Sequence, residues 1–536
     1  MARKLKETKY IFITGGVTSS LGKGIVGASL GVLLKGQGFN VTLQKFDPYL
    51  NLDPGTMSPY QHGEVFVTED GCETDLDLGH YERFIDTNLS RVNNITSGMI
   101  FSEVLAKERR GDYLGNTVQI IPHVTNEIEK HIIAANKSNE FDIIITEIGG
   151  TIGDIESLPF LEAIRQFQFK NKANCTHIHL TLIPYLEASG EFKTKPTQHS
   201  VKELRTIGIK SDIIICRSHI PFPNSIKDKI ALFCDVESNE VIMCPDAPSI
   251  YNVPLALEKE DILKTLSHKL NFDLQESELK EWKEYINIIH KENKPKVKIA
   301  LVGKYTSLSD SYLSVTEAIN HAAAANYCDT DVTYIDSEKL NEANTHELLK
   351  DHDGILIPGG FGDRGIEGKI SAAKYARENN IPYFGLCLGM HIAIIEFARN
   401  ILKLESAHST EFNQNTDYPV IDFLPQQRQI YEKGGTMRLG SYPCLIEKNS
   451  KLFDAYKEEK IYERHRHRYE FNNDFKKTFE ANGGVFSGIS PDGNLVEVFE
   501  IKDHKWFLAC QFHPEFKSRP YKSHPLFLNF IKAALN

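Results

Sequence analysis

Long apolar runs, an excess of basic charge and paired cysteines are all missing from this 536-residue chain. No apolar run approaches the roughly 18 residues that span a bilayer, and the basic start has no apolar core before a small-residue cleavage site. We therefore expect neither a membrane anchor nor a secretory signal. The net charge of −11 argues against a nucleic-acid binder, which needs a basic surface. Nine cysteines without a Cys-x-x-Cys pair exclude a zinc ribbon and favour a reducing, cytoplasmic compartment.

Apolar, β-branched runs alternate with helical stretches along the whole chain, which is typical of α/β proteins. The run at 141–146 is continuous, as expected for a strand that is covered on both faces. Between 271 and 295 the sequence is charged, but Trp282 and its apolar neighbours recur at helical spacing, which indicates a linker helix. We predict two α/β domains, 1–270 and 296–536, each a mostly parallel sheet flanked by helices.

Cys387 lies in Gly385-Leu-Cys-Leu-Gly389, between an apolar strand and a predicted helix. This strand–turn–helix context exposes a nucleophile, and the helix N-terminus favours its thiolate, although a lone cysteine is more often a buried structural residue. In Gln511-Phe-His-Pro-Glu515, His513 can serve as general base and Glu515 can orient it. The glycine-rich segment 358–362 can turn backbone N–H groups toward an oxyanion. Together these motifs predict a catalytic triad.

The segment 15–24, Gly-Gly-Val-Thr-Ser-Ser-Leu-Gly-Lys-Gly, resembles a P-loop, in which backbone N–H groups and Lys23 hold phosphates. It is one residue longer than the usual pattern, and Gly24 replaces the hydroxyl residue that normally touches magnesium. An ordinary glycine-rich turn is the alternative. If magnesium–ATP binds here, carboxylates must replace the hydroxyl, and Asp77 and Glu147 are the candidates. A solvated acidic loop is the alternative explanation for Asp77.

Three other segments have polar patterns that suit either ligands or solvent. Two lysines and two hydroxyl groups at 193–198 could bind a triphosphate, and the segment 153–156 could accept hydrogen bonds from a ribose or a base. Lysine pairs are more often plain surface charge. His465 and His467 could form a metal site, but no third ligand is evident, so an exposed basic strand is the alternative.

The C-terminal motifs, in this order, resemble the class I glutamine amidotransferases over roughly residues 296–535. The resemblance implies that Cys387 attacks the amide of glutamine, that a glutamyl thioester forms, and that ammonia leaves. Gly360 would contribute to the oxyanion hole. The residues that the resemblance assigns to glutamine binding are Gly360, Leu388, Gly389, Met390, His391, Glu411 and Arg468.

Longer strings, such as 15–24, Asp53-Pro-Gly-Thr-Met-Ser58, Asp75-Leu-Asp-Leu-Gly-His-Tyr-Glu82 and Glu147-Ile-Gly-Gly150, resemble the CTP synthase family over nearly the whole chain. The family implies that ATP phosphorylates the 4-oxygen of UTP and that ammonia, passed internally, displaces the phosphate to give CTP. It also implies Mg²⁺, activation by GTP, feedback inhibition by CTP, and homotetramers that sometimes form filaments.

The resemblance assigns nucleotide-site residues one by one. ATP would contact Ser20, Leu21, Gly22, Lys23, Gly24, Ile25, Asp77 and Asp246. UTP or CTP would contact Ser19, Asp154, Ile155, Glu156, Lys193, Thr194, Lys195, Pro196, Thr197, Gln198 and Lys229. Lys23 and Lys45 would support phosphoryl transfer, and Asp77 and Glu147 would hold magnesium.

The sequence departs from the family pattern at two places. His391 stands where glutamine is common, which changes the expected contact with the substrate glutamine. The stretch 420–434 is shorter than expected, which predicts weaker or altered stimulation by GTP. Another amidoligase, such as a cobyrinate-type amidase, and a non-catalytic assembly protein derived from an enzyme are the competing interpretations.

Overall fold

The computed structural model describes residues 4–136, 139–277, 279–423 and 434–536, which form two compact units. The first unit comprises the chain up to Asp53 together with Asp77–Ile286, and the second comprises Pro54–Leu76 and Asn287–Asn536. The segment Pro54–Leu76 therefore packs with the C-terminal half of the chain, although it precedes most of the first unit in sequence. No helix of the described residues has both the length and the apolar character needed to cross a bilayer.

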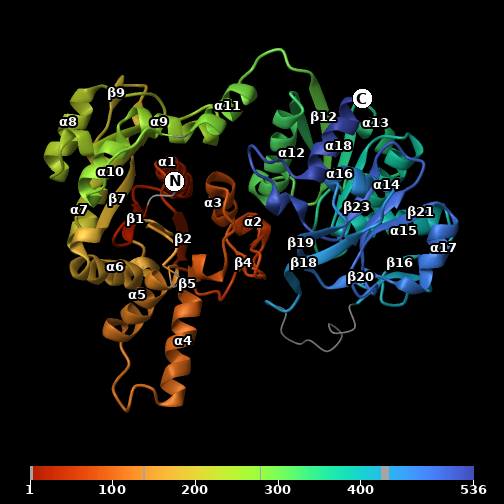
Figure 1. Cartoon of the computed structure of the whole chain (residues 1–536), viewed down its shortest axis with the longest axis horizontal. Helices are drawn as coiled ribbons and strands as arrows, with labels where there is room; N and C mark the ends of the chain where they lie inside the picture. The colour runs from red at the N-terminus through yellow and green to blue at the C-terminus, as the bar shows by residue number, and fades with distance from the viewer. Residues whose placement is uncertain (1–3, 137–138, 278, 424–433) are drawn as a thin grey trace. The chain divides into compact units, whose positions relative to one another are not determined.

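The first unit is built on a seven-stranded sheet in which every pairing is parallel (Figure 1). The predicted parallel sheet is confirmed. Its central strands read as unbroken β-branched runs because helices cover both faces. In spatial order the strands are β11 (Val241–Pro245), β10 (Ile213–Ser218), β7 (Cys175–Leu182), β1 (Lys9–Gly15), β6 (Ile143–Ile148), β2 (Val41–Asp47) and β5 (Asn94–Thr96).

Helices cover both faces of this sheet. Phe12, Phe46 and Ile148 on one face form a core with α4, α5 and α6, and α1 packs with β2, α3 and α9 on the other. The helices are α1 (Lys23–Gly36), α3 (Asp77–Ile85), α4 (Ser97–Arg110), α5 (Thr125–Ala134), α6 (Leu158–Lys170), α7 (Lys195–Thr206), α8 (Asn224–Cys234), α9 (Val253–Lys259) and α10 (Ile262–Leu270). A short hairpin joins β8 (Tyr185–Leu186) and β9 (Glu191–Phe192).

Helix α11 (Lys280–Ile289) lies within the stretch 271–295. It buries Trp282, Tyr285 and Ile286 on one side, and the indole Nε1 of Trp282 donates a hydrogen bond to the carbonyl of Tyr251 at 2.9 Å. A buried indole N–H needs such a partner, so this bond fixes the start of the helix against the first unit.

The second unit has a nine-stranded sheet with a parallel and an antiparallel half. The parallel half consists of β13 (Asp329–Asp336), β12 (Lys296–Gly303), β14 (Gly354–Ile357), β15 (Tyr383–Leu386) and β23 (Phe507–Cys510). The antiparallel half continues with β22 (Val496–Ile501), β21 (Gly484–Ile489), β18 (Arg438–Ile446) and β19 (Lys460–His467). The expected parallel sheet is present in this half, whereas the antiparallel extension was not expected.

Helices again cover both faces of the parallel half. On one side lie α12 (Leu313–Ala325), α16 (Lys451–Tyr456) and α18 (Pro525–Leu535), and on the other α14 (Ile366–Glu378) and α15 (Leu388–Asn400). The remaining elements of the unit are α2 (Pro59–His62), β3 (Phe66–Val67), β4 (Glu73–Thr74), α13 (Thr345–Leu349), β16 (His408–Ser409), β17 (Pro419–Phe423), β20 (Tyr469–Phe471) and α17 (Lys476–Ala481).

Candidate active sites

Charged side chains converge at the carboxyl ends of β2 and β6 in the first unit. Lys45 and Glu147 are register partners on these parallel strands, so their side chains lie side by side. The ammonium group of Lys45 lies 3.0 Å from Glu147 Oε1 and also pairs with Asp77 at the start of α3. Ligand groups collect at this edge of an open parallel sheet, as the sequence led us to expect for Glu147.

Gly24 lies directly against the two carboxylates predicted to hold magnesium. A Cβ at this position would lie 2.3 Å from Oδ1 of Asp77 and 3.3 Å from Oε2 of Glu147. The space that a serine or threonine side chain fills in the usual P-loop is therefore taken here by Asp77. This explains why the motif carries glycine at a place where a hydroxyl is usual.

Two groups of this cluster were given no role from sequence. Tyr81 donates a hydrogen bond from its hydroxyl to Glu147 and is fully buried. Asp47 lies 3.9 Å from the ammonium of Lys45, and burial together with the nearby carboxylates raises the pKa of Asp47 to about 7. Burial also raises the pKa of Glu147. Tyr81 stands four residues after Asp77 on one helix, a spacing that places both on the same face and was a usable signal.

The loop between β1 and α1 approaches α7 very closely. A Cβ on Gly16 would lie 1.5 Å from the hydroxyl oxygen of Ser200, so only glycine fits at this contact. Lys23 spans the loop and donates to the carbonyl of Gly150 at 2.6 Å, and burial lowers the pKa of Lys23. The structure thus brings the middle of α7, whose first residues are predicted to bind UTP, next to the predicted phosphate loop.

Arg217, to which the sequence assigned no role, links Asp246 to the predicted phosphate loop. Arg217 donates to Asp246 at 3.1 Å and to the backbone carbonyl of Ser20 at 3.1 Å, and His219 lies 3.1 Å from the other Asp246 oxygen. The two predicted ATP residues, Ser20 and Asp246, therefore share one partner.

The other predicted nucleotide residues lie on the loops and helices around this edge. Asp154 accepts a hydrogen bond from the backbone of Thr151 at 2.6 Å, and Ile155 and Glu156 are exposed. Lys193 pairs with Glu191, and the charge of Lys229 also acts on Glu191. Thr197 is buried and bonded to Thr181, and Gln198 donates to Thr194. Their roles stay predictions.

In the second unit, Cys387 occupies a strained turn between β15 and α15. Its φ of 51° and ψ of −100° lie outside the regions that non-glycine residues prefer, a strain that is typical of functional sites. A Cβ on Gly385 would lie 2.6 Å from the Gly389 backbone, and one on Gly389 would lie 2.3 Å from the Ile357 carbonyl. Both glycines of the motif are therefore required by close backbone approach.

His513 and Glu515 follow β23, the strand that pairs with β15. The imidazole Nδ1 of His513 lies 2.7 Å from Oε1 of Glu515. Burial alone would lower the pKa of His513, but Glu515 and Cys387 outweigh it and raise this pKa to about 10. The histidine is thus held as a cation beside the cysteine.

The glycine-rich segment after β14 lies against the base and the nucleophile. A Cβ on Gly359 would lie 2.8 Å from His513 Cε1 and 3.7 Å from Cys387 Cβ. The N–H of Gly362 donates to Glu411 at 2.9 Å, and burial raises the pKa of Glu411. The predicted oxyanion segment, nucleophile and base are therefore brought together.

The remaining predicted glutamine residues surround this turn. Leu388, Gly389 and Met390 begin α15 behind Cys387, and Arg468 donates to the hydroxyl of Thr436 at 2.8 Å. The ring of His391 bonds to the side chain of Gln511 at 2.9 Å. Gln511 had no assigned role, although it lies within the quoted motif.

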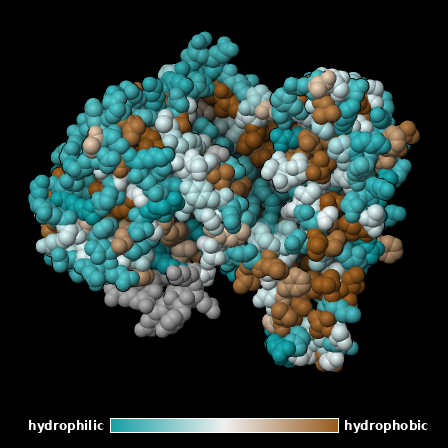
Figure 2. All heavy atoms as spheres, turned by 180° about the vertical axis from the view of Figure 1, so that it is seen from behind, coloured by the Kyte–Doolittle hydropathy of each residue, from teal (hydrophilic) through white to brown (hydrophobic). Residues whose placement is uncertain are grey.

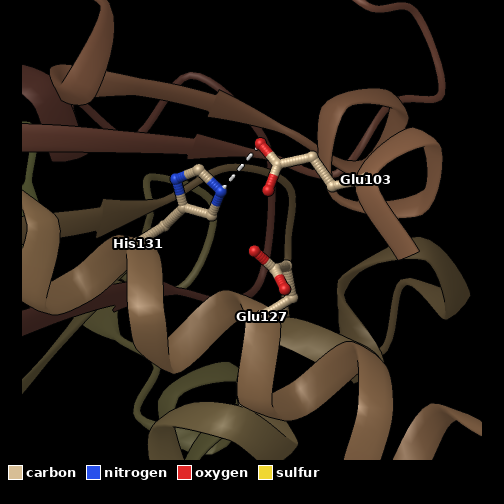
Figure 3. Close-up of side chains that lie close together, drawn as sticks. All are labelled: Glu103, Glu127 and His131. Atoms are coloured by element: carbon tan, nitrogen blue, oxygen red, sulfur yellow. Dashed lines mark ion pairs between the residues drawn. The ribbon is translucent and has the colours of Figure 1, made fainter. Parts of the chain in front are cut away.

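Two other clusters of the described residues have the residue types of metal ligands. The rings of His465 and His467 are buried and bonded to each other at 3.0 Å. The alternative interpretation, an exposed basic strand, is therefore wrong for these two residues. Figure 3 shows Glu103, Glu127 and His131 of the first unit close together, with His131 3.3 Å from Glu103. Glu127, however, already pairs with two lysines, Lys107 and Lys130. These ammonium groups supply the positive charge, so the cluster is a structural ion-pair network between α4 and α5.

The comparisons with known proteins match both halves of the chain. Residues 9–272 match the family model for the CTP synthase N-terminus, and residues 307–533 match class-I glutamine amidotransferase. The chain is 59% identical over 529 residues to CTP synthase of Bacillus subtilis, covering 98% of this chain and 99% of that protein. It is 60% identical over 531 residues to CTP synthase of Clostridium kluyveri, covering 99% of each. A solved glutaminase domain of Trypanosoma brucei CTPS with bound acivicin is 40% identical, with a TM-score of 0.43, over 44% of this chain and 93% of that one.

The fold and the matched domains define an amidoligase, an enzyme that forms a carbon–nitrogen bond with glutamine as the amido donor. Identity of this extent over almost the full length identifies the family. The chain belongs to the CTP synthase family, which confirms the resemblance seen in the sequence.

Proposed function

We propose that the enzyme converts UTP to CTP in three linked steps. ATP transfers its γ-phosphoryl group to the 4-oxygen of UTP, glutamine hydrolysis releases ammonia, and ammonia displaces the phosphate at carbon 4. ADP, phosphate, glutamate and CTP are the products. The observation that carries this proposal is the coexistence of a phosphate-loop cluster with paired carboxylates in one unit and a Cys387–His513–Glu515 set in the other.

The cluster at β2 and β6 supplies what phosphoryl transfer needs. The loop backbone and Lys23 hold the phosphates, and Lys45 stabilises charge on the transferred group. Lys45 is already oriented by Glu147 and Asp77, so its ammonium has little freedom before substrate arrives. UTP lies with its phosphates at the start of α7, next to Gly16 and Ser200.

Asp77 and Glu147 are the residues that would hold Mg²⁺. They offer hard oxygen donors, and both carboxylates lie against Gly24, which has no side chain to displace them. Asp47 is a third carboxylate of the cluster, and Asp77 and Glu147 contribute to raising its pKa, so a bound cation would relieve the repulsion between these carboxylates. Bound magnesium would neutralise phosphate charge during the transfer.

In the second unit Cys387 is the nucleophile. Its sulfur attacks the amide carbon of glutamine, and His513 delivers the proton that ammonia takes as the carbon–nitrogen bond breaks. Backbone N–H groups near Gly360 stabilise the oxyanion, and Glu411 and Arg468 hold the charged ends of glutamine. Water then attacks the thioester, with His513 accepting its proton, and glutamate leaves.

We further propose that the enzyme is a cytoplasmic homotetramer, which can extend to filaments. Figure 2 shows hydrophobic side chains gathered on the part of the first unit that carries α4 and α5. The exposed apolar residues of α4 and of the segment between α4 and α5 include Leu105, Leu114, Ile120 and Ile121, and Leu114 is 90% exposed. A contiguous apolar patch of this kind marks an interface. Nine free thiols suit a reducing compartment.

GTP is proposed to activate the glutaminase half, and CTP to inhibit by occupying the UTP site. The short stretch 420–434 lies mostly outside the described residues, so the weaker GTP response stays a prediction. A glutamine-dependent rate measured against GTP concentration tests it, and full stimulation would refute it.

The experiment that tests the function is an assay with UTP, ATP and Mg²⁺, supplied in parallel with glutamine and with ammonium. CTP, followed by its absorbance, is expected from both nitrogen sources. A competing amidoligase would leave UTP unchanged under both conditions, and a non-catalytic assembly protein would also release no ADP.

A further inference from the structure

Three buried side chains form a chain of contacts behind the nucleophile turn. The amide Nε2 of Gln511 lies 3.8 Å from the sulfur of Cys387, and its Oε1 lies 2.9 Å from Nε2 of His391. Gln511 is fully buried, and His391 is 3% exposed. A buried amide is costly unless its polar atoms are bonded, so these two contacts hold the side chain in place.

The fold explains why these residues meet. His391 follows Cys387 by four residues on the first turn of α15, so the two lie on one face of the helix. Gln511 follows β23, whose last residue pairs with the end of β15, and the N–H of Cys387 donates to the carbonyl of Cys510 at 2.7 Å. Gln511 and the base His513 are two residues apart in an extended stretch, so both face the nucleophile.

The two polar neighbours of the sulfur act differently on its two protonation states. The thiol donates to the carbonyl of Arg466 at 3.7 Å, but a thiolate has no proton to donate. The amide N–H of Gln511, in contrast, gains strength as a donor when the sulfur becomes an anion. Gln511 therefore favours the reactive form of Cys387.

His391 determines which end of the Gln511 amide faces the sulfur. Burial lowers the pKa of His391 to about 4, so the ring is neutral at physiological pH. Oε1 of Gln511 can only accept, so the ring nitrogen of His391 that contacts it, Nε2, carries the proton. This N–H holds Oε1 and directs the amide N–H₂ at Cys387.

We propose that Gln511 is a catalytic residue that donates a hydrogen bond to the Cys387 thiolate, and that His391 is a positioning residue that fixes the orientation of this amide. The inference rests on the proposed function only for the role of Cys387 as nucleophile. It replaces direct contact with the substrate as the role of the His391 ring.

The test measures the rate of Cys387 alkylation by iodoacetamide against pH, together with kcat and KM for glutamine hydrolysis, in the full-length enzyme. Gln511→Met removes the donor at similar length, His391→Leu removes the orienting N–H, and His391→Gln keeps a donor. Among the described residues, the titratable groups that face Cys387 are His513 and Cys510, and His467 faces His391. None of these is altered by the variants.

In Gln511→Met we expect the alkylation midpoint to rise by about one to two pH units and kcat to fall about 10- to 100-fold, the effect of losing a hydrogen bond to a charged group. His391→Leu should follow in the same direction, with KM nearly unchanged, and His391→Gln should restore kcat to within about threefold of the parent. Unchanged alkylation profiles in both loss variants, or a rise in KM alone, would overturn the inference.

CTP formation from ammonium in the same preparations separates this inference from the proposed function. It should persist in every variant, which shows that the chain is folded. If the parent enzyme makes no CTP but the alkylation midpoints shift as expected, the reaction assignment falls and the role of Gln511 stands.

Discussion

Replacing Gly24 with alanine tests whether the carboxylates at the phosphate loop are the metal-holding groups of the synthetase reaction. The new Cβ would lie 2.3 Å from Oδ1 of Asp77, whereas an ordinary contact is at least 3.4 Å. The carboxylate must therefore move by about 1 Å, a displacement that costs on the order of 100-fold when it affects a reacting centre. CTP formation should fall by about this factor with glutamine and with ammonium alike.

The stability of this variant should change far less than its activity. Alanine gains about 1 kcal/mol of helix propensity over glycine, and the steric conflict costs about 1–3 kcal/mol, so the net loss of stability is about 0–2 kcal/mol. Gly27→Ala on the same helix is the matched control, because its Cβ meets only apolar side chains at 3.3 Å and beyond. Synthesis at the parent rate in Gly24→Ala, or an equal loss in Gly27→Ala, would refute the reasoning.

Two further predictions follow from the packing of each unit. Gly359→Ala places a Cβ 2.8 Å from His513 Cε1 and so displaces the base. CTP synthesis with glutamine should fall by roughly 100-fold, while synthesis with ammonium keeps its rate. A loss of both activities would contradict this prediction. Burial lowers the pKa of His177 and of His179 to about 3, so between pH 6.5 and pH 3 the unfolded chain binds protons that the folded chain does not. Stability should therefore fall by about 2 kcal/mol per histidine between pH 7.5 and pH 5, and the urea midpoint of His177→Gln should fall less than that of the parent.

The sequence predicted central parallel strands because they are apolar, β-branched runs that helices bury on both faces. The run at 141–146 is of this kind, and it overlaps β6 (Ile143–Ile148). The antiparallel strands β18, β19, β21 and β22 carry mixed polar residues, since they include buried ion pairs such as Arg438 with Glu497. Such pairs interrupt the apolar pattern from which a strand is predicted, and this is why that half of the sheet was missed.

Candidate site residues could be predicted where they lie in a local motif, and they were missed where only the fold brings them together. Cys387, His513 and Gly24 lie in glycine-rich or strand-end motifs. Arg217 reaches the phosphate loop from a distant strand, and Tyr81 reaches Glu147 from a helix. The contact of His391 with Gln511 joins positions 120 residues apart, so no spacing rule could have shown it. The packing of Pro54–Leu76 with the second unit was equally invisible in the sequence.

The central claim is that one chain holds two separable chemistries, and Cys387→Ala tests it most directly. The variant is assayed with UTP, ATP and Mg²⁺, once with glutamine and once with ammonium as the nitrogen source. We expect CTP formation from glutamine to vanish while formation from ammonium continues at the parent rate. Loss of both activities, or continued use of glutamine, would contradict the account.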